Sequence, residues 1–340
     1  ELAFGTIDSW LVARLTGGAV HVTDRTNASR TMLYNLGTGE WDPDLLELFG
    51  VPHEMLPELA ASGQVMGEAL PEHLGAAIPV AGMAGDQQAA LYGQGCVEAG
   101  QAKNTYGTGA FLLVHTGDRR PPAAEGLLTT VAAGPRGEAA FALEGSIFIA
   151  GAAIQWLRDG LGILEKASDS EAIARSVPDN GGVYFVPAFV GLGTPHWEPA
   201  ARGTITGLTR GSTRAHLVRA ALESMAYGTA DLLDAMEERG KLSVPELRMD
   251  GGASANDWLM QFQADVLGRA VERPDMVETT ALGAAGLAGV TLGVWKGPED
   301  FLSHRRFDRF EPGITDEQRK ALRAGWERAV GVALSWADDG

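Results

Sequence analysis

The chain has 340 residues, of which 45% are hydrophobic and 21% are charged, a globular composition with enough length for two domains. Its 27 Lys and Arg residues against 44 Asp and Glu residues give a formal charge of −17, which argues against nucleic acid or an anionic membrane as a partner. A single cysteine, Cys96, excludes an intramolecular disulfide and a site of several thiolates, so we expect a cytoplasmic protein.

The first part of the chain mixes helical and turn signals. We expect a helix over residues 9–15, capped by Asp8, and a second short helix over 42–48. The apolar run at 78–84 is typical of a buried strand in a parallel sheet, and it ends just before Asp86, which a further helix should follow. Because open parallel sheets carry their chemistry at the carboxyl ends of the strands, Asp86 becomes a candidate site residue.

Further along the chain, hairpin signals give way to alternating strands and helices, which is typical of an α/β domain. The expected strands cover 104–106, 111–115, 127–131, 138–143, 183–190 and 246–249. The expected helices cover 152–161, 213–238 with Ser212 as the cap, 256–267, 281–295 and 316–336. The domains are therefore expected to be residues 1–95 and 96–340, divided at a turn-rich stretch without periodic signal.

A glycine-rich tip, Gly107, Thr108 and Gly109, joins two of these strands. Glycines there can adopt positive φ and let phosphate oxygens approach the backbone N–H groups, while the Thr108 hydroxyl donates one more hydrogen bond. The tip would suit a nucleotide triphosphate. An ordinary hairpin turn is the alternative.

Asp86 is the main catalytic candidate. A carboxylate between a strand and a helix can accept the proton of a substrate hydroxyl, as phosphoryl transfer requires, and Gln87 could hold a neighbouring hydroxyl. The alternative, which does not exclude that role, is that Asp86 only caps the helix.

Two pairs of residues spaced four apart open predicted helices: Gly151 with Gln155, and Gly252 with Asn256. Residues i and i+4 share one helix face, so each pair could offer bare backbone and an amide to a flat heterocycle or a ribose. Alternatively, Asn256 only caps its helix and Gly252 only turns the chain.

Other classes of site lack support. The seven histidines lie singly, so no metal site built from histidine is expected. No G-x-x-x-x-G-K-[ST] motif of a P-loop occurs. The longest weakly polar stretch, 281–295, is shorter than the roughly 20 residues of a membrane helix, so we expect no membrane insertion.

At this point the residues resemble a known family. Residues 84–94 (AGDQQAALYGQ) and 102–109 (AKNTYGTG) are similar to the FGGY family of carbohydrate kinases, in particular to its members that act on glycerol. Residues 203–208 (GTITGL), together with segments that follow, resemble the second signature of that family.

The resemblance implies an actin/hexokinase-like ATPase fold with two RNase H-like domains, an active site in the cleft between them, and phosphorylation of glycerol to sn-glycerol 3-phosphate with ATP and Mg²⁺. It implies that Asp86 is the general base, that Asp86 and Gln87 contact glycerol, and that Phe111 faces the glycerol carbons. The residues that it implies for the nucleotide site are Thr108, Gly151, Gln155, Gly252 and Asn256.

The sequence also departs from the family pattern. Family members begin with a phosphate-binding hairpin and glycerol-binding residues that have no match here, so the resemblance covers only the C-terminal two-thirds. We therefore expect an incomplete first domain and no activity from this chain alone. A non-catalytic nucleotide-binding module and a kinase for another polyol or sugar stay open as alternatives, and so does a homo-oligomer.

Overall fold

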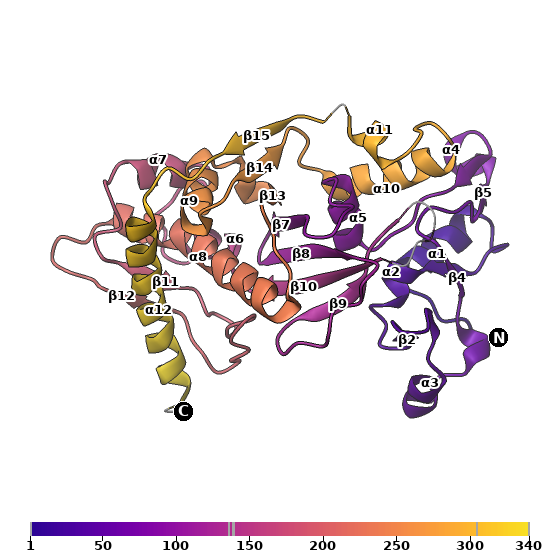
Figure 1. The fold of residues 1–340 in the computed structure, drawn as a ribbon, viewed down its shortest axis with the longest axis horizontal. Coiled ribbons are helices and arrows are strands. Elements are labelled where there is room, and N and C mark those ends of the chain that lie inside the picture. Colours follow the sequence, from indigo (N-terminus) through magenta and orange to yellow (C-terminus); the bar gives the residue numbers. More distant parts are fainter. Residues whose placement is uncertain (1, 135–136, 138–139, 304, 339–340) are drawn as a thin grey trace.

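The computed structural model describes residues 2–134, 137, 140–303 and 305–338 (Figure 1). The helices are α1 (Ile7–Leu15), α2 (Arg25–Ala28), α3 (Pro43–Phe49), α4 (Pro71–Leu74), α5 (Asp86–Gly93), α6 (Gly151–Asp159), α7 (Asp169–Arg175), α8 (Arg214–Gly240), α9 (Asp257–Leu267), α10 (Thr279–Thr291), α11 (Pro298–Leu302) and α12 (Asp316–Asp338), with 3₁₀ turns η1 (His53–Met55) and η2 (Gly252–Ala255). The strands are β1 (Val22–Asp24), β2 (Tyr34–Asn35), β3 (Glu40–Trp41), β4 (Glu58–Ala60), β5 (Gly67–Ala69), β6 (Ile78–Val80), β7 (Ala102–Tyr106), β8 (Ala110–Gly117), β9 (Leu128–Val131), β10 (Phe141–Ile147), β11 (Tyr184–Val186), β12 (Thr204–Thr206), β13 (Leu247–Asp250), β14 (Val271–Pro274) and β15 (Phe307–Phe310).

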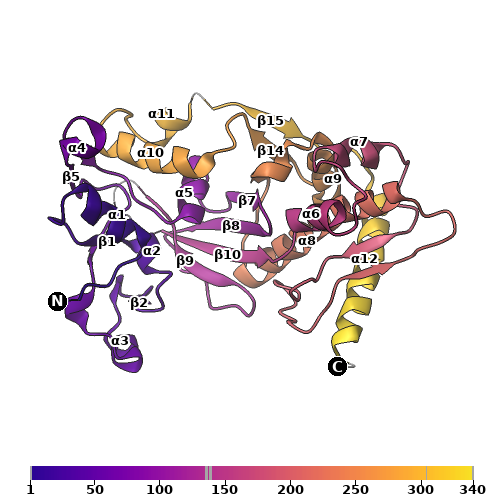
Figure 2. The same cartoon turned by 180° about the vertical axis from the view of Figure 1, so that it is seen from behind.

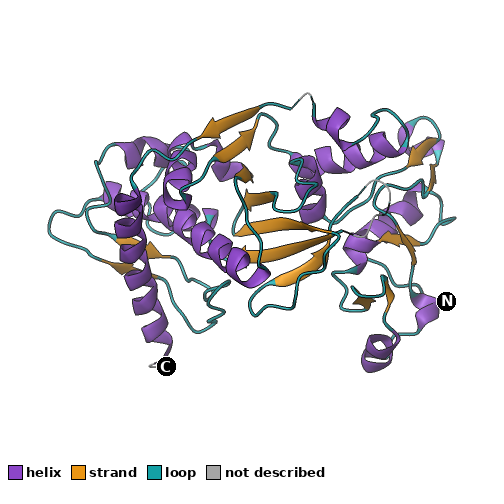
Figure 3. Cartoon of the chain, viewed as in Figure 1, coloured by secondary structure: helices purple, strands orange, loops and turns teal. Residues whose placement is uncertain are grey.

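A mixed seven-stranded sheet lies at the centre of the molecule, in the order β15-β14-β13-β7-β8-β10-β9 (Figure 3). The hairpin of β7 and β8 and the following strands β10 and β9 pair antiparallel, whereas β13 pairs parallel with both β7 and β14. The predicted change from hairpins to alternating strands and helices is thus confirmed for these elements. The prediction for 138–143 starts inside a segment whose residues 138 and 139 lie outside the described part of the chain.

The two faces of this sheet are covered by different helices. Side chains alternate along β7, so Tyr106 points to one face and Lys103 and Thr105 to the other. On the first face, the buried Tyr106 hydroxyl donates to Gln263 Oε1 of α9 and lies 3.1 Å from the Met225 carbonyl oxygen of α8. On the second face, helix α5 lies against the strands, and its contact with α10 is close enough that a methyl group on Gly283 would overlap the α5 backbone. The second face carries the polar residues discussed below.

The N-terminal part consists of short helices and two-stranded sheets gathered at one end of the molecule, opposite the end that carries α12 (Figures 1 and 2). Here one prediction was wrong. The run at 78–84 is not a buried parallel strand: β6 covers only Ile78–Val80, pairs antiparallel with β5, and leaves Ile78 44% exposed. The apolar pattern is present, but within the described residues β6 pairs with β5 alone, and antiparallel.

Two predicted helix caps also need correction. Helix α8 is capped by Thr213, which forms a reciprocal capping box with His216, and not by Ser212. Helix α1 begins after Thr6, and Asp8 lies inside its first turn, where its carboxylate accepts hydrogen bonds from the hydroxyls of Thr6 and Thr23. The helix expected over 42–48 is α3, which begins one residue later, at Pro43. Asp42 is its cap and accepts from the backbone N–H of Leu45.

None of the helices in the described ranges is both long enough and apolar enough to cross a bilayer.

Candidate active site

Helix α5 starts at Asp86, and the carboxylate of Asp86 is exposed. The cap of this helix is Gly85, so the alternative in which Asp86 is the capping residue is wrong. Gly85 is itself held in place, because its N–H donates to the Thr26 hydroxyl at 2.8 Å. The Thr26 hydroxyl in turn donates to the Asp24 carboxylate.

Asp24 fixes the position of Thr26, and through it that of Gly85. It is fully buried, and it accepts hydrogen bonds from the Ser62 hydroxyl at 2.6 Å and from the Asn27 side chain and backbone. Burial raises the pKa of Asp24, and the hydrogen bonds from Ser62, Asn27 and Thr26 act in the opposite direction. The segment before Asp86 is therefore fixed by a buried network, although the Asp86 carboxylate is in solvent.

Gln87 lies next to Asp86 and joins α5 to the sheet. Its Nε2 donates to Asp86 Oδ2 at 3.2 Å, and its Oε1 accepts from the Lys103 ammonium at 2.5 Å. Lys103 Nζ also donates to Thr105 Oγ1 at 2.9 Å. These contacts place the carboxylate and the amide beside β7, the strand that leads into the glycine tip.

Phe111 lies on the same face of the sheet. It pairs with Thr105 across the β7–β8 hairpin, and cross-strand partners point to the same side. Its side chain is 38% exposed, which is unusual in a sheet whose neighbouring strand positions are buried. An exposed aromatic ring thus shares the face that carries Gln87.

The glycine tip packs on the start of α6. The backbone N–H groups of Gly151 and Ala152 donate to the carbonyls of Gly107 and Thr108 at 3.0 and 3.1 Å. A methyl group on Gly151 would come within 2.5 Å of the Gly107 carbonyl oxygen, so this close approach requires glycine. Gln155, one turn along α6, is exposed.

The turn after β13 lies beside the same tip. Asp250 pairs with Thr105, and the next residue, Gly251, has φ +83° and packs so tightly against Tyr106 that a methyl group would overlap the Tyr106 carbonyl oxygen. Gly252 differs, because nothing in the described protein lies within 4 Å of a methyl group built there. The structure thus brings the Gly107–Gly109 tip, α6 and the Gly252 turn together.

Asn256 does cap helix α9, since its Oδ1 accepts from the Leu259 N–H at 2.9 Å. The interpretation of Asn256 as a helix cap is therefore correct. Any contact of Asn256 with a ligand would use the NH₂ group of its amide.

The sequence reasoning passed over three features of this site. The first is Lys103, which is buried within β7. The second is Asp24, which fixes the residue before Asp86 through Thr26. The third is the bidentate ion pair between Arg30 and the buried Glu144, with N–O distances of 2.5 and 3.0 Å. The expected strand 104–106 begins one residue after Lys103, whereas β7 covers Ala102–Tyr106. The signal that could have found Lys103 is its position two residues before Thr105, on the same face of an extended strand.

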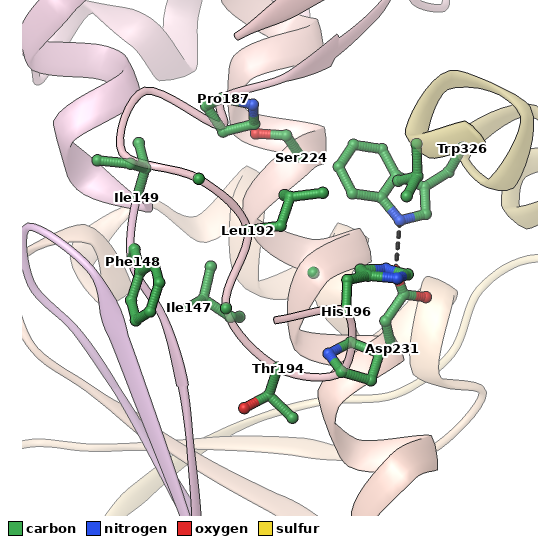
Figure 4. A pocket seen from close by; sticks show the side chains of 15 residues that line it. Ile147, Phe148, Ile149, Pro187, Leu192, Thr194, His196, Ser224, Asp231 and Trp326 are labelled. Carbon is green, nitrogen blue, oxygen red and sulfur yellow. Dashed lines mark hydrogen bonds between the residues drawn. The ribbon is translucent and has the colours of Figure 1, made fainter. Parts of the chain in front are cut away.

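A cavity outside this site lies between α8, α12 and the loop before residue 198 (Figure 4). Its volume is about 40 Å³, and none of the sequence-predicted site residues lines it. Its lining includes the acidic residue Asp231, which accepts from the Trp326 indole at 2.6 Å and pairs with Arg323 at 2.9 Å. Burial of its carboxyl group raises the pKa of Asp231 to about 6.

Within the described ranges, no group of three His, Cys, Asp or Glu side chains is arranged to hold a metal ion. The site offers an exposed carboxylate, an amide and glycine-lined backbone, which together can accept a proton from a hydroxyl and bind phosphate oxygens.

Comparison with known proteins adds the following. Residues 2–93 match the model of the N-terminal domain of the FGGY family of carbohydrate kinases, and residues 102–292 match the model of its C-terminal domain. The chain is 57% identical to a glycerol kinase of Nitratidesulfovibrio vulgaris and 58% identical to one of Carboxydothermus hydrogenoformans, over 100% and 99% of this chain and 68% of each relative.

Solved structures agree. A crystal structure of Plasmodium falciparum glycerol kinase with ADP matches with a TM-score of 0.91 and 36% identity, and covers 98% of this chain and 67% of that chain. A xylulose kinase of Lactobacillus acidophilus matches with a TM-score of 0.84 at 21% identity, over 97% of this chain and 67% of that one, which shows the shared fold.

Proposed function

This chain belongs to the FGGY family of carbohydrate kinases, with the actin/hexokinase-like fold of that family, and on this premise we propose that the protein transfers the γ-phosphoryl group of ATP to glycerol. The product would be sn-glycerol 3-phosphate. Identity above 55% to glycerol kinases along the whole chain supports glycerol as the acceptor. At that level, the alternative of a non-catalytic module is not favoured.

Asp86 is the proposed general base. It accepts the proton of the attacking hydroxyl while a new O–P bond forms and the bond between the γ-phosphorus and the bridging oxygen of ATP breaks, releasing ADP. The observation that carries this role is the position of the carboxylate: exposed at the start of α5, yet fixed through Gly85 and Gln87 on both sides. Gln87 and Phe111 are proposed to contact the glycerol hydroxyls and carbons.

The nucleotide is proposed to bind across the glycine tip. Gly107, Thr108 and Gly109 would contact its phosphates, and Gly151 with Gln155 and Gly252 with Asn256 would contact its base and ribose. The bare surface at Gly252, where the protein itself leaves room, supports this assignment.

Mg²⁺ is proposed to arrive with ATP. Among the described residues, no three side chains form a metal-binding group. In nucleotide sites, Mg²⁺ is bound mainly by phosphate oxygens and water, with only one or two carboxylates from the protein. A magnesium ion carried by ATP therefore fits a site of this kind. When bound, the ion neutralises charge on the phosphates.

The test is Asp86→Asn in the full chain that the gene encodes, measured as ATP-dependent glycerol phosphorylation. Loss of a general base lowers kcat by about 10²–10⁴-fold. Asp44→Asn is the matched control, because Asp44 is also an exposed acid in the first turn of a helix and lies on α3. Equal kcat in both variants would contradict the role of Asp86, and a higher kcat/KM for xylulose than for glycerol would contradict the substrate.

A further inference from the structure

Lys103 is a charged residue in the protein interior, and the proposed reaction as described above assigns it no role. Its side chain is fully buried in β7, in the middle of the seven-stranded sheet. Burying an ammonium group costs free energy unless its donors are used and its charge is compensated. A lysine at such a position needs a physical explanation.

Partners for the ammonium group lie on the α5 side of the sheet. Two of its three donors go to Gln87 Oε1 and Thr105 Oγ1. Burial lowers the pKa of Lys103, and the carboxylates of Asp250, Glu144 and Asp86 act in the opposite direction. These carboxylates come from β13, β10 and α5, so the positive charge lies among negative groups from three elements.

The contact with Lys103 decides which way the Gln87 amide faces. A lysine ammonium can only donate hydrogen bonds, so the atom of Gln87 next to it has to be the carbonyl oxygen. The NH₂ group of Gln87 then points away from Lys103, and it donates to Asp86 Oδ2. If the amide turned over, two donors would face each other at Lys103 and the Asp86 carboxylate would lose a donor.

We propose that Lys103 is a positioning residue for phosphoryl transfer, which holds the Gln87 amide in the one orientation that presents its NH₂ group to Asp86 and to a hydroxyl of the acceptor substrate. This inference rests on the proposed function. It assigns acceptor recognition partly to a residue that does not touch the acceptor.

The experiment compares Lys103→Met with the parent in the full chain that the gene encodes. Methionine keeps much of the length of the side chain but donates no hydrogen bond. We expect KM for glycerol to rise at least about tenfold, the scale of a lost hydrogen bond to a charged group, while KM for ATP changes less than about twofold. Lys103→Gln retains an N–H donor and should restore part of the glycerol KM.

A double-mutant cycle with Gln87→Ala separates positioning from a general structural effect. If Lys103 acts through Gln87, then Lys103→Met added to Gln87→Ala should change the glycerol KM less than about twofold further. Should Lys103→Met fail to fold, the same cycle is run with Lys103→Gln. Thr229→Val is the matched control, because Thr229 is fully buried and forms a hydrogen bond with Tyr106 on the opposite face of β7. This substitution should lower stability without changing the KM for glycerol.

The outcomes are distinct. A parent enzyme that does not phosphorylate glycerol overturns the proposed function itself. An active parent in which the Lys103 and Gln87 effects simply multiply, or in which KM for ATP rises as much as KM for glycerol, overturns the positioning role alone.

Discussion

Two adjacent glycines in the turn after β13 are expected to respond in opposite ways to the same substitution. Gly251→Ala places a methyl group at φ +83°, where it would overlap the Tyr106 carbonyl oxygen. The left-handed backbone costs about 1–2 kcal/mol and the overlap about 1–3 kcal/mol more, so the protein should lose about 2–5 kcal/mol of stability.

Gly252→Ala should leave the fold intact. A methyl group there meets no protein atom within 4 Å, and alanine restricts the unfolded chain, so stability should stay equal or rise by about 0.4–1 kcal/mol. If the nucleotide lies against this bare backbone, the methyl group takes space that the ligand needs. An overlap of about 1–3 kcal/mol weakens ADP binding roughly 5- to 150-fold.

The assays are thermal unfolding and calorimetric titration with ADP. Each 1 kcal/mol moves Tm by about 2–4 °C in a larger domain, so Gly251→Ala should be clearly separated from the parent. Gly331→Ala is the matched control, because Gly331 also faces open space but lies on α12. Unchanged ADP affinity in Gly252→Ala, or a loss of stability as large as that of Gly251→Ala, would refute the reasoning and leave Gly252 as an ordinary turn residue.

Three further predictions concern charge and burial. Because the pKa of Asp231 is raised from 3.8 to about 6, folded protein holds a proton there that unfolded protein releases, so stability should fall by up to about 3 kcal/mol as pH rises from 4 to 6. Denaturant unfolding should show a smaller fall in Asp231→Asn, and identical pH dependence in both proteins would contradict this. Arg30→Gln leaves the Glu144 carboxylate buried without its partner and should cost roughly 1–3 kcal/mol in urea unfolding, a value reduced because the Arg30 side chain is 41% exposed; no loss would show that the pair is not stabilising. Burial raises the pKa of Cys96 to about 12, so a thiol reagent should modify it only on unfolding, and rapid labelling of native protein is the contrary result.

Much of the candidate site could be predicted from local sequence. A glycine-rich tip between two strand patterns and a glycine pair after a strand both have short-range physical signatures, since few residues other than glycine adopt such turns. The helix expected after Asp86 is also present, although it begins at Asp86 and its cap is Gly85. These features depend on residues close in the chain.

Long-range packing decided the rest. The apolar run before Asp86 reads as a buried strand, but β6 is largely exposed and, in the described part of the chain, pairs antiparallel with β5 in a two-stranded sheet. Periodicity predicts that Lys103 and Thr105 share a face of β7, but it does not say which helix covers that face. Only the packed structure brings Gln87 onto Lys103, 16 residues away in sequence.

The sequence by itself thus determined the kinds of turns, the positions of most helices and the candidate residues for phosphoryl transfer, because these follow from φ preferences and side-chain type over a few residues. The tertiary structure decided which of them meet, because the Lys103–Gln87 and Gly251–Tyr106 contacts form only when separate elements pack against one sheet.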